Sequence, residues 1–104
     1  MKTFIKPIMA SIFVCASFVS TQAMSADVAA GKAKSGICAS CHGAAGISAN
    51  PMWPNLAGQK EQYLAKQITA FRDGTRTDAM MAPMVKGLSD ADVANLAAYF
   101  SSLK

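Results

Sequence analysis

One short segment limits what this chain can build: Cys38 and Cys41 stand three positions apart, and His42 follows immediately. Cysteine and histidine are common zinc ligands, but a structural zinc site takes four of them in a tetrahedron. His42 is the only histidine of the sequence, and the one further cysteine, Cys15, lies in a leader segment described below. Zinc sites are also expected to show a second Cys or His pair. The sequence therefore disfavours zinc.

Two other chemistries use a Cys-x-x-Cys pair. A thioredoxin-like redox disulfide belongs to a βαβ setting, which this sequence lacks. A structural disulfide is feasible in an oxidising compartment, but it gives the adjacent His42 no role. Cys-x-x-Cys-His is the attachment signature of c-type haem, because two thiols one helical turn apart can reach the two vinyl groups on one haem edge. His42 would then reach the iron as an axial ligand, and we predict one covalent haem c per chain.

The N-terminus has the pattern of a secretory signal peptide. Lys2 and Lys6 precede an apolar stretch at residues 8–19, and small residues follow, which is the order of regions in such a peptide. The stretch is short for a membrane span, and an uncleaved anchor is the alternative. Covalent haem attachment takes place outside the cytosol, so the leader agrees with the haem motif. Together they predict a periplasmic protein whose mature form does not span the membrane.

Cleavage is expected after Ala23 or Ala26, which assigns residues 1–26 to the signal peptide and residues 27–104 to a single domain. Ten basic and six acidic residues give the whole chain a net charge of +4, and two of the basic residues leave with the leader. The basic residues that remain are scattered without a run or an aromatic ladder, which argues against nucleic-acid binding. A core of this size supplies only about 3–5 kcal/mol, so a covalent cofactor would add needed stability.

The domain is predicted to be all-α, because β-branched residues are too sparse for alternating strands. Asp27 can cap a first short helix. A periodic apolar stripe marks a second helix, with Gly74 where a C-cap is expected. Ser89 and Asp92 resemble a capping box at the start of the last helix. The three helices are expected over residues 27–37, 60–72 and 89–103.

The segments between these helices, residues 36–58 and 75–87, are expected to be irregular. The second contains "MMAPM", which offers Met80, Met81 and Met84 as ligands. A second histidine ligand is excluded, so the sixth position of the iron is methionine, water, a weak ligand or open. The segment lies about forty residues after His42, far enough to reach the opposite haem face. Methionine with histidine is a standard cytochrome c ligand pair.

The sequence resembles the small bacterial class I cytochromes c and each half of the tandem dihaem cytochromes c of the periplasm. The matching stretches are "CASCHG", "WPNLAGQ" with "QYLAKQITAF", and "AMMAPMVKGLSDADVANLAAYFSSLK". The resemblance implies three main helices around one haem, with the N- and C-terminal helices crossed. In this family the axial methionine precedes the leucine of "LSD" by seven residues, which points to Met81. Met84 is the runner-up, and Met80 is third.

The same resemblance assigns supporting roles. Pro54 would accept a hydrogen bond from the ring of His42 through its carbonyl, and Leu56 would pack on the porphyrin. The alternative is that Pro54 only shapes a turn. The resemblance also implies that the terminal helices cross at Gly31, Tyr99 and Phe100. It further implies that the haem propionates have as neighbours Gly58, Gln59 and Arg76.

The function implied is that of a soluble periplasmic electron carrier, not an enzyme, whose iron cycles between ferrous and ferric with both ligands bound. A monomer is expected, which meets redox partners transiently: an oxidase, a dehydrogenase or a quinol-oxidising complex. One alternative is a haem subunit of a larger respiratory or dehydrogenase complex. Another is a haem enzyme or gas sensor with an open sixth site, although the sequence shows no distal histidine or acid-base pair for it.

Overall fold

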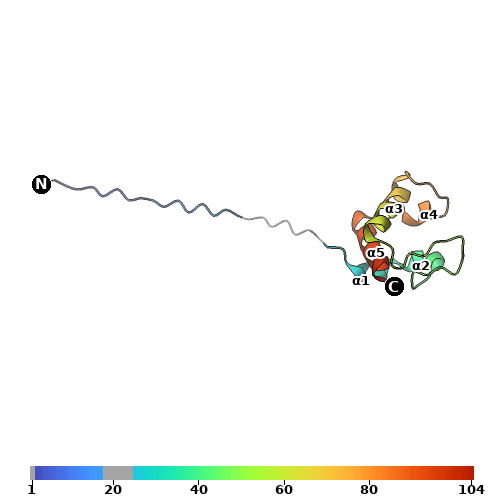
Figure 1. Ribbon diagram of the computed structural model, residues 1–104. Coiled ribbons are helices and arrows are strands. Elements are labelled where there is room, and N and C mark those ends of the chain that lie inside the picture. Colours follow the sequence, from blue (N-terminus) through green and yellow to red (C-terminus); the bar gives the residue numbers. More distant parts are fainter. Residues whose placement is uncertain (1, 18–24) are drawn as a thin grey trace.

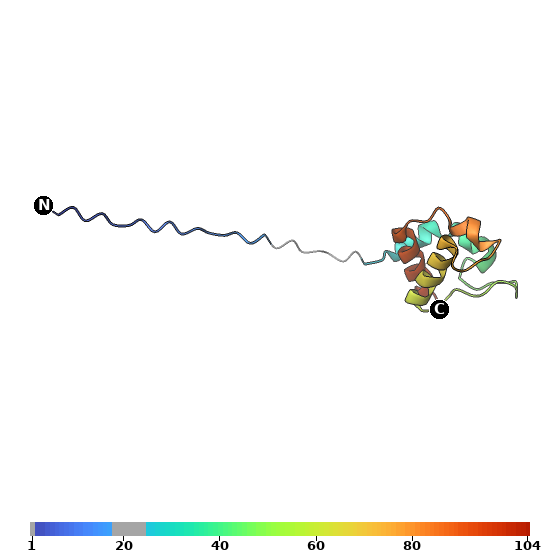
Figure 2. The same cartoon turned by 90° about the horizontal axis from the view of Figure 1, so that it is seen from above.

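The computed structural model describes residues 2–17 and 25–104, so the expected cleavage point after Ala23 lies outside the described residues. Residues 2–17 are exposed and form no helix or strand, and residues 28–104 fold into a helical domain (Figures 1 and 2). Within these two ranges there is no strand, and no helix is long and apolar enough to cross a membrane. The five helices are α1 (Val28–Lys34), α2 (Gly36–His42), α3 (Glu61–Asp73), α4 (Met81–Val85) and α5 (Asp90–Ser102).

The N- and C-terminal helices α1 and α5 pack against each other, as expected (Figure 1). Gly31 is buried at their contact, and a β-carbon there would lie 2.8 Å from the β-carbon of Tyr99 and would collide with the main chain of Asn95. Asp27 caps α1 by accepting from the N–H of Ala30 at 3.1 Å, and its own N–H donates to Asn95 Oδ1 at 2.8 Å. Only glycine allows the two backbones to come this close.

The core lies between α3 and α5. Leu96 and Ala97 of α5 are fully buried, and Phe100 is nearly so. Leu64 of α3 packs on them, and α3 ends at Gly74, which has a φ of 82°. Positive φ is the usual conformation of a C-capping glycine. The second expected helix is therefore confirmed to within one residue at each end.

The last helix begins with the expected capping box. Ser89 Oγ accepts from the N–H of Asp92 at 3.0 Å, and Asp92 Oδ2 accepts from the N–H of Ser89 at 3.1 Å. This bond holds the pKa of the Asp92 carboxyl below its ordinary value. The two reciprocal bonds satisfy N–H groups that a helix start otherwise leaves without partners.

The expected helix over residues 27–37 was wrong at its C-terminal end. The chain breaks at Ser35, whose hydroxyl donates to the carbonyl of Lys32 at 2.7 Å. Serine competes with the helical backbone in this way. A new helix, α2, then begins at Gly36, so the prediction that residues 36–58 lack regular structure was wrong for the first seven of them. This helix carries the whole Cys-x-x-Cys-His motif.

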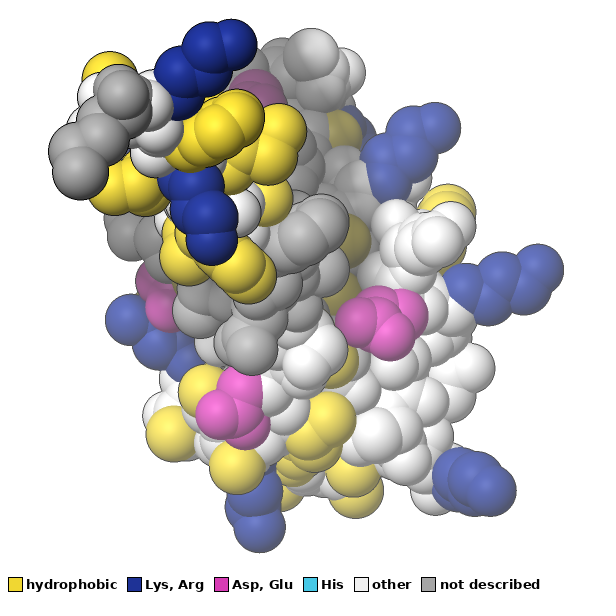
Figure 3. Space-filling model, turned by 90° about the vertical axis from the view of Figure 1, so that its left-hand side faces the viewer, with side chains coloured by type: hydrophobic (Ala, Val, Ile, Leu, Met, Phe, Trp, Pro, Cys, Tyr) yellow, Lys and Arg dark blue, Asp and Glu magenta, His cyan; other side chains and the backbone are white. Residues whose placement is uncertain are grey.

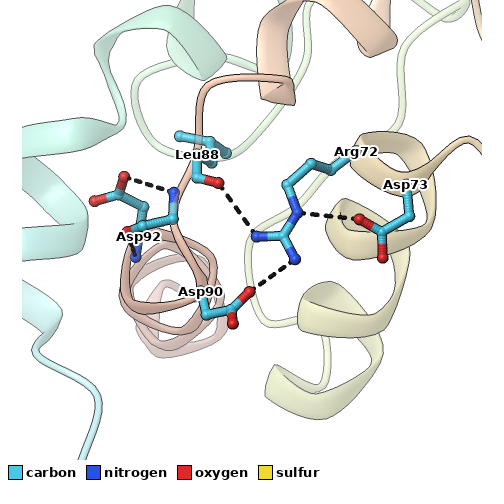
Figure 4. Close-up of polar contacts among 6 residues, drawn as sticks. Arg72, Asp73, Leu88, Asp90 and Asp92 are labelled. Carbon is cyan, nitrogen blue, oxygen red and sulfur yellow. Dashed lines mark hydrogen bonds and ion pairs between the residues drawn. The ribbon is translucent and has the colours of Figure 1, made fainter.

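The expectation of an irregular segment over residues 75–87 was also wrong in part, because it contains α4. Pro83 stands in the first turn of this helix, where a missing N–H costs nothing. Arg72 joins the two ends of the segment, as Figure 4 shows. Its guanidinium donates to the carbonyl of Leu88 at 3.2 Å and to Asp90 Oδ1 at 2.7 Å.

Candidate haem-binding site

Helix α2 places the motif on one surface. Cys38 and Cys41 are three residues apart in the helix, so their side chains share a face. His42 is the last helical residue, and Gly43 ends the helix with a φ of 86°. Burial raises the pKa of the Cys38 thiol, with a smaller opposing effect from a hydrogen bond to its backbone. Both cysteines are half-buried and line a cavity.

His42 is only 6% exposed and its ring is oriented by the backbone. Its Nδ1 lies 2.8 Å from the carbonyl oxygen of Pro54. A carbonyl can only accept, so Nδ1 carries the proton and donates. Nε2 is then the ring nitrogen that is left available to a metal. A backbone acceptor of this kind fixes the ring orientation and makes the imidazole a stronger ligand.

The loop that presents Pro54 is itself held by hydrogen bonds. The carbonyl of Gly46 accepts from the N–H groups of Leu56 and Ala57 at 2.8 and 3.0 Å. Asn55 Oδ1 accepts from the N–H of Ser48 at 2.8 Å. Gly46 has a φ of 73°, and a β-carbon there would lie 2.8 Å from the nitrogen of Ala57. The sequence did not assign Gly46 or Asn55 to the site, because their contacts form only when the loop closes on itself.

The methionines lie on and beside α4. Met81, its first residue, is half-buried, whereas Met84 is 43% and Met80 is 57% exposed. Asp78 accepts from the N–H groups of Met80 and Met81 through Oδ1, at 2.8 and 2.9 Å. These two bonds hold the pKa of its carboxyl below the ordinary value. The sequence did not single out Asp78.

One cavity of about 610 Å³ brings these groups together. This volume lies within the range of about 300–1,000 Å³ that is typical of small-molecule and cofactor sites. Its walls come from α2, α3, α4, α5 and the loops before α3 and α4, and they are mainly aliphatic, aromatic and thioether side chains. Among them are the residues selected from the sequence: Cys38, Cys41, His42, Pro54, Leu56, Met80, Met81 and Met84.

The donor set fits a covalent haem. The two thiols and the imidazole belong to the α2 wall, and the thioethers of three methionines belong to the α4 wall. The remaining lining of the cavity is largely apolar. Such surroundings suit a flat, largely apolar macrocycle held by histidine and methionine. When bound, haem supplies a metal centre that accepts and releases one electron.

Of the three candidate neighbours of the haem propionates, two line the cavity and one does not. Arg76 lines the cavity, stacks over the Phe71 ring at 4.4 Å and donates to Gln67 Oε1 at 2.8 Å. Gln59 also lines it. Gly58 is absent from the described cavity wall, and its N–H donates to the carbonyl of Phe100 at 3.1 Å. Its structural role is therefore at the C-terminal end of α5.

An all-helical domain with crossed terminal helices, closed around a cavity that holds Cys-x-x-Cys-His and methionines, is the class I cytochrome c fold. The family model for cytochrome c matches residues 28–104, and the chain belongs to the cytochrome c family.

Three similar proteins illustrate the membership. Cytochrome c-554(548) of Halomonas halodenitrificans is 51% identical over 79 residues, which cover 73% of this chain and 95% of that protein. A thiosulfate dehydrogenase electron acceptor of Thiomonas intermedia is 52% identical over 69 residues, covering 64% of this chain and 31% of its own length. The crystal structure of reduced cytochrome c4 from Pseudomonas stutzeri superposes with a TM-score of 0.73 at 41% identity, over 76% of this chain and 46% of that one.

The chain thus spans nearly all of one relative and less than half of the other two. These similarities confirm the predicted fold class, the covalent haem c and the function of an electron-transfer protein rather than an enzyme.

Proposed function

We propose that residues 27–104 carry one electron at a time on a haem attached through Cys38 and Cys41, with His42 Nε2 and Met81 as axial ligands. The observation that supports this most directly is that side chains of both α2 and α4 line one and the same cavity. Met81 is favoured over its neighbours because it is the least exposed of the three methionines in "MMAPM". Met84 is the alternative ligand.

The residues around the cavity would set the reduction potential of the iron, and no bond of a substrate is made or broken. The carbonyl of Pro54 keeps the proton on His42 Nδ1, and Leu56 contributes an apolar surface to the cavity. A thioether ligand favours ferrous iron, and an apolar cavity disfavours the extra charge of the ferric state. Both effects raise the reduction potential, so a fairly high-potential carrier follows.

We assign the carrier to the periplasm and residues 1–26 to a cleaved signal peptide. The support is the order of basic, apolar and small residues at the N-terminus, together with a haem whose attachment takes place outside the cytosol. Cleavage after Ala23 or Ala26 leaves α1 intact, since this helix begins at Val28. The mass of the mature protein distinguishes the two sites and also reports the added haem.

The redox partners are expected to dock briefly at the rim of the cavity. Exposed apolar side chains, Ile37, Met52, Met80 and Met84, surround the cavity. The basic residues of the folded domain are scattered along the sequence without a run. Figure 3 shows the side of the molecule from which the N-terminal segment extends, and there too the Lys and Arg side chains stand apart, with acidic side chains among them. Dispersed charge of this kind gives modest electrostatic steering, and transient redox encounters bury little area. The native protein is proposed to be a free monomer, with membership of a larger complex as the alternative.

The Thiomonas intermedia relative is an electron acceptor of thiosulfate dehydrogenase. That role supports a dehydrogenase as the electron donor of this chain. A quinol-oxidising complex is the other candidate donor, and a terminal oxidase is the acceptor expected for a carrier of fairly high potential.

An anaerobic redox titration of the exported holoprotein, followed optically, tests the proposed ligand set. We expect a one-electron transition, low-spin spectra in both oxidation states and the ferric methionine-to-iron band. A high-spin, five-coordinate resting state would instead favour an open-site enzyme or sensor.

Two further experiments test the proposed partners and the oligomeric state. Stopped-flow mixing with a reduced periplasmic dehydrogenase measures electron delivery to the holoprotein. Gel filtration of the native periplasmic form distinguishes a free carrier from a subunit of a complex.

A further inference from the structure

We propose that Asp78 is a positioning residue for the sixth ligand: it holds the first turn of α4 in the geometry that directs Met81 into the cavity. This inference rests on the proposed assignment of Met81 as the ligand. Asp78 itself is not offered as a ligand.

The carboxylate bridges two consecutive backbone donors. Asp78 Oδ1 accepts from the N–H of Met80 at 2.8 Å and from the N–H of Met81 at 2.9 Å. The main-chain carbonyl of the same residue accepts from the N–H of Ala82 at 3.0 Å. One residue therefore satisfies three successive N–H groups in the turn that leads into α4, where a helix start otherwise leaves N–H groups without partners.

Apart from its packing against α3, little else defines this helix. It is five residues long, Pro83 donates no hydrogen bond, and helices of this length are not stable by themselves. Its far end is anchored by Val85, which is 3% exposed and whose carbonyl accepts from the N–H of Leu88 at 3.1 Å. Met81 stands between this anchor and the Asp78 cap. Loss of the cap would free the end of the helix that carries the proposed ligand.

Asp78 also lines the cavity, so its charge could act on the iron directly. Two substitutions separate charge from geometry. Asp78→Asn keeps an acceptor oxygen in the same place and removes the charge. Asp78→Glu keeps the charge and moves the acceptor by one methylene, and glutamate is not among the residues preferred at this kind of cap.

The experiment measures how readily added imidazole displaces the methionine from the ferric holoprotein, from the loss of the methionine-to-iron band. We expect the association constant of imidazole to rise roughly five- to tenfold in Asp78→Glu, the size of effect expected when a cap is lost. In Asp78→Asn it should stay within about twofold of the unmodified protein, since Asn is as good a cap as Asp.

Asp27→Ala is the matched control, because it removes an Asp cap from α1, away from the described cavity wall. It should lower the melting temperature and leave the imidazole constant unchanged. A rise of the constant in Asp78→Asn without a rise in Asp78→Glu would show that the charge of Asp78, and not the placement of its acceptor oxygen, controls access to the iron, and it would overturn the positioning role. No rise in Asp78→Glu would overturn it as well.

Met81→Ala separates failure of this inference from failure of the proposed ligand set. If Met81→Ala keeps the low-spin methionine spectrum, then Met81 is not the ligand, and both proposals fall. If Met81→Ala becomes high-spin while Asp78→Glu behaves like the unmodified protein, the ligand assignment stands and only the positioning role is rejected.

Discussion

The two walls that face each other across the cavity are built in different ways. The α2 wall holds its imidazole at 6% exposure and orients it through a backbone carbonyl on a loop that is closed by further backbone bonds. The α4 wall places its methionines on a five-residue helix in a segment that is largely exposed. That helix is held by the carboxylate of Asp78, and the ends of its segment are joined by Arg72.

This difference predicts that the two walls respond differently to substitution. Backbone bonds inside a closed loop are lost only when the loop opens, whereas bonds to exposed side chains can be removed by one substitution. We therefore expect changes on the α2 wall to decide whether haem is held at all. Changes on the α4 wall should decide the spin state, the potential and the ease with which an external ligand enters.

The largest effect is expected from His42→Ala. It removes part of the attachment signature together with the proposed proximal ligand, so the amount of exported holoprotein should fall to near background. Haem-stained gels and the absorbance of periplasmic extracts measure this amount. Met81→Ala should accumulate holoprotein at nearly the unmodified level. If the two variants accumulate equally, the two walls do not differ as described.

Next in size is the effect of Met81→Ala on the iron. Loss of the thioether should remove the low-spin methionine spectrum and lower the potential by on the order of 100 mV, part of the roughly 0.8 V that axial ligands span. Met84→Ala should leave both nearly unchanged. Optical spectra and redox titration of the two variants provide the measurement, and the opposite pattern would move the ligand to Met84.

The two walls also differ in how much of them the sequence predicts. Cys38, Cys41 and His42 are adjacent in the chain, so their chemistry is visible as a motif. Pro54 and Leu56 came from a family resemblance. The helix α2 was missed because Gly36 was assigned to the glycine- and proline-rich loop that follows. In the structure Gly36 is the first residue of α2, and nothing lies within 4 Å of a β-carbon added there, so no close contact requires a glycine at this position.

On the other wall, five residues are too few to display helical periodicity, and Pro83 masked α4 further. An Asp shortly before such a turn is a recognisable capping pattern, and it could have drawn attention to Asp78. The bridge from Arg72 to Asp90 could not be foreseen, because it spans 18 positions and depends on how α3 meets α5.

A smaller effect on the α4 wall is expected from Arg72→Lys. The substitution keeps the charge, but an ammonium group cannot reproduce the planar fork that reaches Leu88 and Asp90 together. The ends of the methionine segment should then separate more easily, and imidazole should bind the ferric iron roughly twofold more tightly, in keeping with the modest strength of exposed ion pairs. Asp73→Ala removes only the outer partner of the guanidinium and should leave the imidazole constant unchanged. An equal effect of both would mean that the contacts of Arg72 with Leu88 and Asp90 are not what holds the methionine segment.

The smallest effect on the site is expected from Ser89→Ala, which removes the cap of α5. This helix supports both walls through Leu96 and Phe100, which also line the cavity. Loss of the Ser89 Oγ bond should destabilise the fold by about 1 kcal/mol and lower the melting temperature by about 4–8 °C for a domain of this size. The methionine band, the potential and the imidazole constant should not change, because α5 contributes none of the proposed ligands.

Thermal unfolding of Ser89→Ala, monitored by far-UV circular dichroism, measures the loss of stability, and the imidazole titration measures any change at the iron. A loss of the methionine band at temperatures well below unfolding would mean that the α4 wall depends on the start of α5, and the walls would then have to be treated as one cooperative unit.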